Sequence, residues 1–182
     1  GAPINMAYVI TPEWWSEGPT HPNNIWGPNM CVRAEIFHSS GIKFNENVGP
    51  SHGNYIMGSE TDFARRATLQ GFKCWHTKRV RVQHIIRPEQ ISVSWLTKRA
   101  FRAGRNKGFE WKTDNKVLSH TPTLFGAPRW RFRALIGDQT RAVLHRISGR
   151  PTGYIYYSCA AYMHRGFIFQ TGNTFVKRLI DV

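Results

Sequence analysis

The stretch Gly58-Ser59-Glu60-Thr61-Asp62-Phe63, which continues as ARRATLQG to Gly71, is the most informative part of the sequence. Ser59 and Asp62 have the spacing of a capping box, in which an acidic residue follows the hydroxyl residue by three positions. Apolar residues then recur at helical spacing, and Gly71 supplies a C-terminal stop. We therefore predict a helix that begins at Ser59. Its first turn carries Glu60 and Asp62, where the positive end of the helix dipole favours ionised carboxylates.

The residues before this helix read mainly as loop. We predict a short strand at Ala7–Ile10, a long ordered loop over residues 11–30, which are rich in Pro, Gly, Asn and Trp, and a short helix from Arg33 to Ser40. The loop contains Trp26-Gly27-Pro28-Asn29-Met30. Gly27 allows a close approach of backbone that a side chain would block.

The residues after the helix predict two short strands and a basic helix. The strands are expected at Lys73–His76 and Val80–His84, which sets the imidazole of His84 at the end of an extended segment. The helix is expected from Gln90 to about Asn106. Its candidate inward residues are Ile91, Trp95 and Leu96, and the basic residues Lys98, Arg102 and Arg105 fall at helical spacing on the other side.

The last third of the chain is predicted to be an appendage. Residues 111–128 contain Thr, Pro, Gly and Asn and are expected to form a linker, whereas residues 129–182 form a basic, aromatic-rich helical tail. Lys and Arg total 25 against 11 Asp and Glu, a formal charge of +14. Such an excess predicts an anionic partner: nucleic acid, a membrane surface or a phosphorylated substrate. The three cysteines have no metal-ligand spacing and favour a reducing compartment.

Five motifs in this order resemble the second half of family 2 glycosyltransferases of the GT-A fold. They are Gly27 to Met30, Phe44-Asn45-Glu46-Asn47-Val48-Gly49, Gly58 to Asp62, Gly71-Phe72 and Val82-Gln83-His84. The resemblance spans roughly residues 7–108. Each motif alone is a weak signal. Five of them in the family's order, at ordinary spacing, make a fairly specific signal.

The resemblance implies an inverting glycosyltransferase of the hexosyltransferase type. Glu60, with Asp62 as the alternate, matches the base that deprotonates the acceptor hydroxyl as it attacks the anomeric carbon. Gly27 and Asn29 match the loop that lines the donor sugar. His84 matches a histidine that helps to hold the divalent metal, Mn²⁺ or Mg²⁺, on the diphosphate.

Three further residues are candidate contacts with donor or acceptor. Trp26 could stack on an acceptor sugar, or serve as loop packing. Arg99 and Arg102 on the basic helix could bind the donor diphosphate or an anionic lipid-linked acceptor, although a solvated face is the ordinary role of such arginines. The expected acceptors are a growing polysaccharide or a lipid-linked glycan.

The sequence departs from the family in having no Asp-x-Asp motif. In the family this motif binds the metal and ends an N-terminal, Rossmann-like half that binds the nucleotide. We therefore expect an α/β chain made of a partial GT-A domain over residues 1–110, lacking its nucleotide-binding half, with the linker and tail attached. The metal site and turnover would depend on that missing half, supplied in cis or in trans, and the chain alone would be inactive.

Two other function classes remain open, and the location is a separate expectation. A basic nucleic-acid-binding module would use the same charge and aromatic residues, but the chain carries no recognisable DNA- or RNA-binding signature. A non-catalytic carbohydrate-binding or scaffold piece needs no base.

The expected location is cytoplasmic, with peripheral attachment to the inner face of a membrane. The basic helix would make that attachment together with tail arginines. The residues are Lys98, Arg99, Arg102 and Arg105 of the helix, and Arg129, Arg131, Arg133, Arg141 and Arg146 of the tail.

Overall fold

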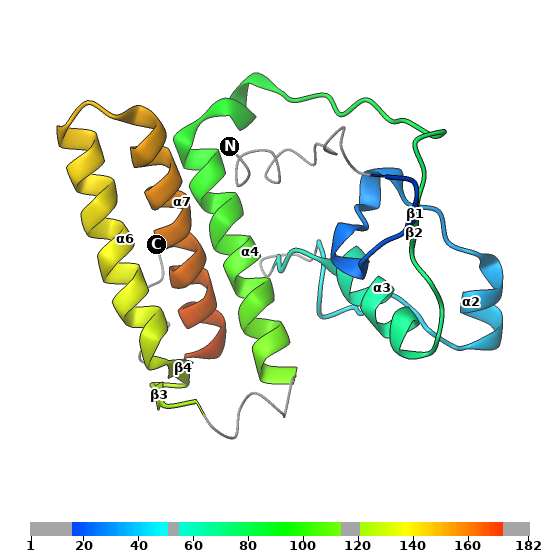
Figure 1. Ribbon diagram of the computed structural model, residues 1–182. Coiled ribbons are helices and arrows are strands. Elements are labelled where there is room, and N and C mark those ends of the chain that lie inside the picture. Colours follow the sequence, from blue (N-terminus) through cyan, green and yellow to red (C-terminus); the bar gives the residue numbers. More distant parts are fainter. Residues whose placement is uncertain (1–15, 51–54, 114–120, 173–182) are drawn as a thin grey trace. The chain divides into compact units, whose positions relative to one another are not determined.

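The computed structural model describes residues 16–50, 55–113 and 121–172, and the chain divides into two compact units. Unit 1 comprises residues 1–86 and unit 2 comprises residues 87–182 (Figure 1). The described residues are mixed α/β and mostly helical, with two small antiparallel sheets. The predicted strand at Ala7–Ile10 lies outside the described residues.

The described residues of unit 1 form two short helices, two single-turn 3₁₀ helices and one two-stranded sheet. The elements in chain order are β1 (Gly18–Pro19), η1 (Pro22–Asn24), η2 (Gly27–Asn29), α2 (Ala34–Ser39), α3 (Ser59–Leu69) and β2 (Trp75–His76). β1 pairs antiparallel with β2, with Gly18 opposite His76. Residues 16–30 therefore form the loop expected from their Pro and Asn content, and β1 joins them to the strand that follows α3.

The core of unit 1 forms where α3 meets the segment around α2. Phe63 and Ala67 of α3 are buried with Ile42, and four partly buried residues pack on them, namely Met30, Val32, Ile36 and Phe72. The ring of Phe44 stacks on Phe63 with 4.6 Å between centroids. This burial orients α3. A helix this short gains most of its stability from packing its apolar face against the rest of the fold.

The two helices predicted in unit 1 are confirmed, and β2 lies within the predicted strand Lys73–His76, whereas the capping box and one strand are wrong. Helices occur where they were predicted, at Ala34–Ser39 and from Ser59. The capping box is wrong, because Gly58, with φ 101°, occupies the N-cap position and no side chain caps the helix. Ser59 is already the first helical residue. The strand at Val80–His84 is also wrong, since those residues have no regular structure and are exposed.

Where the structure describes unit 2, it consists of a short 3₁₀ helix, three long helices and a small hairpin. Its elements are η3 (Pro88–Ile91), α4 (Val93–Thr113), β3 (Thr123–Leu124), β4 (Ala127–Pro128), α6 (Arg129–Ile147) and α7 (Pro151–Thr171). α7 lies between α4 and α6 and packs on both of them (Figure 1). The hairpin turns at Phe125 and Gly126, both with positive φ, as a two-residue turn requires.

Three glycines allow α4 and α7 to approach closely. A Cβ added at Gly104 would overlap the carbonyl oxygen of Met163, and one added at Gly166 would overlap that of Phe101. One turn after Gly104, a Cβ at Gly108 would come within 2.9 Å of the carbonyl oxygen of Phe167. Small residues at helical spacing thus bring the two backbones together, as in other close helix crossings.

The two compact units differ from the predicted division into residues 1–110, 111–128 and 129–182. In the structure, residues 87–182 form one unit. α4 continues to Thr113, and residues 123–128 form the hairpin that leads into α6, within the span expected to be a linker. Ala127 of this hairpin is fully buried with Ile168, against Phe132 and Leu135. No helix in the described parts of the chain combines the length and apolar character needed to cross a membrane.

The inward face of α4 also differs from its prediction. Leu96 is buried as expected, but Ile91 is 68% exposed and lies in η3 rather than in the helix. Arg105, expected on the polar side, is buried. Its Nε donates to Gln170 Oε1 at 3.1 Å and its guanidinium lies 5.3 Å from the ring centre of Phe169. The face of α4 that meets α7 is set by Gly104 and Gly108, which carry no hydrophobic signal.

Candidate functional site

The first turn of α3 places Glu60 directly against Gly27 of η2. A Cβ added at Gly27 would come within 2.8 Å of both Cγ and Cδ of Glu60 and would overlap its Oε1. The carboxylate of Glu60 therefore lies over the backbone of Gly27, and it is only partly buried. Two motifs that are distant in sequence, one in the loop and one at the helix start, thus meet at a single point.

Asp62, the second acidic residue of this turn, is held in a structural ion pair. Its Oδ2 accepts from Arg66 Nε at 2.9 Å, and Nη2 of the same arginine donates to the carbonyl of Lys43 at 2.7 Å. The two side chains are 24% and 35% exposed. Asp62 thus helps to fix α3 to the chain next to the buried Ile42. Glu60 is left as the carboxylate of this turn that faces Gly27.

Asn29 connects η2 to the segment that leads to His84. Its Nδ2 donates to the carbonyl of Val80 at 3.3 Å, although both residues are exposed. Trp26 is the N-cap residue of η2 and is partly buried. The hydrogen bond therefore brings the predicted donor-loop residues next to the chain that carries His84, while His84 itself is exposed.

A hydrogen-bonded carboxylate orders the start of that same segment. Glu17 Oε1 accepts from Thr77 Oγ1 and from the backbone N of Lys78, both at 2.7 Å. These hydrogen bonds, helped by the positive charge of Arg79, lower the pKa of Glu17 below its ordinary value. The turn after β2 is fixed in this way to residues before β1, which sets the direction of the chain towards Val80.

The described residues do not by themselves form a metal site. Nowhere in residues 16–50, 55–113 and 121–172 do three His, Cys, Asp or Glu side chains gather as candidate ligands. His84 is then a single candidate ligand, and a divalent cation would need further ligands from elsewhere.

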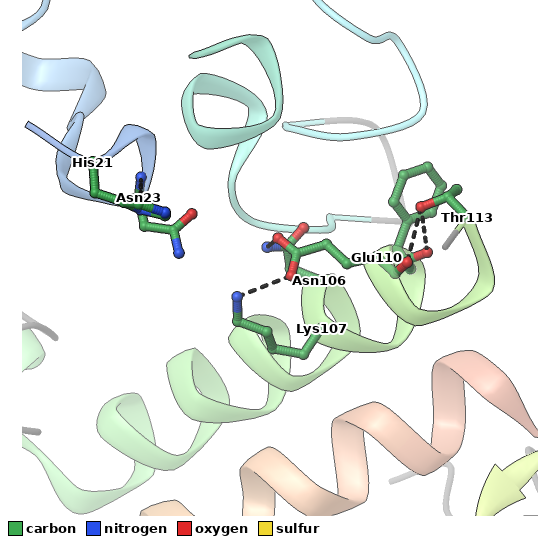
Figure 2. Close-up of polar contacts among 7 residues, drawn as sticks. His21, Asn23, Asn106, Lys107, Glu110 and Thr113 are labelled. Atoms are coloured by element: carbon green, nitrogen blue, oxygen red, sulfur yellow. Dashed lines mark hydrogen bonds and ion pairs between the residues drawn. The ribbon is translucent and has the colours of Figure 1, made fainter. Parts of the chain in front are cut away.

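Arg99 and Arg102 belong to α4 in unit 2, and their relation to Glu60 stays a prediction. The guanidinium of Arg99 lies 5.4 Å from the ring centre of Trp95. Arg102 is exposed. Further along the same helix, Glu110 accepts from Lys107 Nζ at 2.9 Å and from Asn106 Nδ2 at 3.2 Å, which stabilises the last turns (Figure 2).

A shallow depression of about 340 Å³ lies beside the core of unit 1. It contains none of the predicted site residues. Its lining comes from the end of α2, the residues just after it and the outer side of α3, namely Ser40, Gly41, Ile42, Arg66, Leu69 and Gln70. Glu60 is not among these lining residues, and its side chain is partly buried.

A polar cluster between α6 and α7 was missed by the sequence reasoning. Arg131 Nη1 bonds to His164 Nδ1 at 3.0 Å, and His164 Nε2 lies 3.5 Å from Asp138 Oδ2. Arg141 donates to the other oxygen of Asp138 at 3.1 Å. The guanidinium of Arg131 also lies over the rings of Trp130 and Phe167, at 4.2 and 4.1 Å. Arg131 is thus held by residues of its own unit, and its contact with a membrane stays a prediction.

Burial changes the titration of this cluster. It lowers the pKa of Arg131 to about 10. It also lowers the pKa of His164, with the adjacent charge of Arg131 acting in the same direction and Asp138 opposing both. Arg131 Nε is buried without a hydrogen-bond partner. The spacing of Arg131, Asp138 and Arg141 along α6 would have indicated a shared face, but their partner His164 comes from another helix.

No family model, curated protein or solved structure matches this chain. The candidate site is defined by its geometry. A partly buried carboxylate at the start of α3 lies against Gly27, and a basic, hydrogen-bonded chain segment lies beside η2.

Proposed function

We propose that this chain is the acceptor-side, base-carrying part of an inverting glycosyltransferase of the GT-A type. The observation that carries the proposal is the contact between Glu60 and Gly27. The resemblance assigns these two residues to the base and to the donor loop, and such roles require them to be neighbours. Their contact supports the proposal, and the order of the five motifs supports it independently.

Glu60 would act as the general base. Its carboxylate would accept the proton of the acceptor hydroxyl. The hydroxyl oxygen would attack the anomeric carbon of the sugar as the bond to the nucleoside diphosphate breaks on the opposite face, which inverts that carbon. Asp62 is the weaker candidate, because its carboxylate is bonded to Arg66.

The donor side of the reaction is assigned by resemblance. Asn29 and Trp26 would line the sugar site together with Gly27, and His84 would contact the diphosphate or its divalent cation. Arg99 and Arg102 would bind phosphate of the donor or of a lipid-linked acceptor. The nucleotide-binding half would come from outside this chain, in cis or in trans. The proposed location is the cytoplasmic face of a membrane.

The test is sugar transfer by the complete polypeptide or complex that contains this chain. Glu60→Gln keeps the size of the side chain and removes its basicity, so we expect turnover to fall by about 10²–10⁴-fold. The midpoint of thermal unfolding, and its shift on adding UDP, GDP or dTDP with Mn²⁺, should stay unchanged, because a base is not required for nucleotide binding.

Glu35→Gln is the matched control. Glu35 is an exposed carboxylate on α2 that pairs with Arg33 at 3.3 Å, and its loss should leave turnover within about twofold, as is usual for an exposed pair. If Glu60→Gln retained the turnover of Glu35→Gln, Glu60 would not be the base. If no nucleotide sugar were used by the wild-type complex at all, the glycosyltransferase proposal itself would fail.

A further inference from the structure

The outward face of α6 carries a stripe of exposed aliphatic side chains. Ile136, Val143, Leu144 and Ile147 are 65%, 55%, 57% and 79% exposed. Positions 136, 143 and 147 are spaced by seven and four residues, so they share one side of the helix. We call these four residues the α6 stripe. A helix that shows so many large aliphatic side chains to water on one side has an unpartnered apolar face.

This face is turned away from the rest of unit 2. The opposite side of α6 contains the buried Asp138 and Ala142, and it packs against α7. α7 in turn separates α6 from α4 (Figure 1), so the three helices lie in a row with α6 at one end. Packing among the described helices of unit 2 therefore uses the other face of α6, and the four stripe residues are exposed.

Arginines surround the stripe, and α6 exposes no acidic side chain. Arg133 lies about one turn before it and Arg129 about two turns before it, on the same side, and Arg146 flanks its far end. All three are exposed. Asp138 is the one acid within Arg129–Ile147, and it is buried and bonded to Arg141. The face thus combines an apolar centre with positive charge at both ends.

We propose that this face lies in the headgroup layer of an anionic lipid bilayer, with the helix parallel to the membrane plane. Aliphatic side chains gain by entering the acyl boundary, while arginines attract anionic headgroups. The helix of 19 residues is about 28 Å long and lies along the surface. This inference deepens the proposed membrane location and is independent of sugar transfer.

The composition of the face distinguishes a lipid surface from two other anionic or apolar partners. A single-stranded nucleic acid gains from aromatic platforms on which bases stack, and the four stripe residues are aliphatic. A second copy of the chain packed stripe to stripe would oppose Arg133 and Arg146 with the same charges, which opposes association. A bilayer with anionic lipid satisfies both the apolar and the charged part of the face.

The experiment is co-sedimentation of the full chain with vesicles of phosphatidylcholine containing about one third phosphatidylglycerol, at low salt. Ile136→Ser/Ile147→Ser removes the centre of the stripe from exposed positions, so the fold should be retained, which circular dichroism checks. We expect the partition coefficient to fall at least about tenfold. The matched control is Ile91→Ser, which removes an aliphatic side chain of similar exposure from η3 and should change binding by less than about twofold.

Charge is tested separately with Arg129→Gln/Arg133→Gln, which should weaken binding to the anionic vesicles and not to pure phosphatidylcholine. Equal binding of wild type and Ile136→Ser/Ile147→Ser would overturn the proposal, and so would absence of wild-type binding. A dimer in sedimentation velocity that the double serine variant dissociates would assign the stripe to a second copy instead. Loss of oligonucleotide binding in that variant would assign it to nucleic acid. None of these outcomes depends on Glu60, so they separate this inference from the glycosyltransferase proposal.

Discussion

Gly104 offers the sharpest test of how unit 2 is held together. An alanine in the middle of an exposed helix is about 1 kcal/mol more favourable than glycine, because it restricts the unfolded chain. At Gly104 that gain is opposed by the overlap of the new Cβ with the carbonyl of Met163. This carbonyl belongs to the backbone of α7 and cannot rotate away, so α4 and α7 must separate.

The expected loss follows from these two terms. Overpacking of this kind costs about 1–3 kcal/mol. The upper end applies here because separation at Gly104 also loosens the contacts at Gly108 and Gly166. After subtraction of the alanine gain, unfolding of unit 2 should become easier by about 1–2 kcal/mol. For a unit of this size the melting temperature should fall by about 4–8 °C for each kcal/mol.

Gly137→Ala in α6 is the matched control. Gly137 is also inside a helix, but an added Cβ would meet only the mobile end of Arg141, at 3.7 Å. It should therefore raise the melting temperature by a few degrees, as expected for helix propensity alone. Both variants are measured by thermal circular dichroism at 222 nm. A Gly104→Ala variant as stable as Gly137→Ala would refute the close crossing of α4 and α7.

Three further predictions concern single side chains. Asp62→Asn should lower the free energy of unfolding of unit 1 by about 0.5–1 kcal/mol in urea, as loss of a partly exposed ion pair does. Glu60→Gln should leave that free energy unchanged. If Glu60→Gln were the more destabilising variant, the roles assigned to the two residues would be contradicted. The pKa of His164 is lower in the folded chain than its ordinary value of 6.5, so the unfolded state binds more protons as pH falls below 6.5. Stability should decrease from there down through the folded pKa, and His164→Gln should flatten that part of a melting-temperature series from pH 8 to pH 5. Burial raises the pKa of the Cys159 thiol, so iodoacetamide should modify it more slowly than the exposed Cys31 at pH 8; equal rates would argue against its burial.

Local signals in the sequence determined several elements of this protein. The apolar spacing after Gly58 and the stop at Gly71 predicted α3, and the Pro- and Asn-rich composition predicted the loop before α2. These features succeed because helix periodicity and backbone preferences act over a few residues. The expected N-cap, Ser59, was wrong by one position. Gly58, in a left-handed conformation, is the N-cap residue, and Ser59 is the first residue of the helix.

Contacts between distant residues were decided only by the tertiary structure. The face of α4 that meets α7 depends on three glycines, which have no side chain for a hydrophobic pattern to register, and for this reason Arg105 was placed on the wrong side. The pairing of Arg131 with His164 joins two helices, and no spacing along one of them encodes it. The sequence named Glu60 and Gly27 as separate candidates. Their contact arises because burial of Phe63 orients α3, and that orientation is a property of the folded core rather than of either motif.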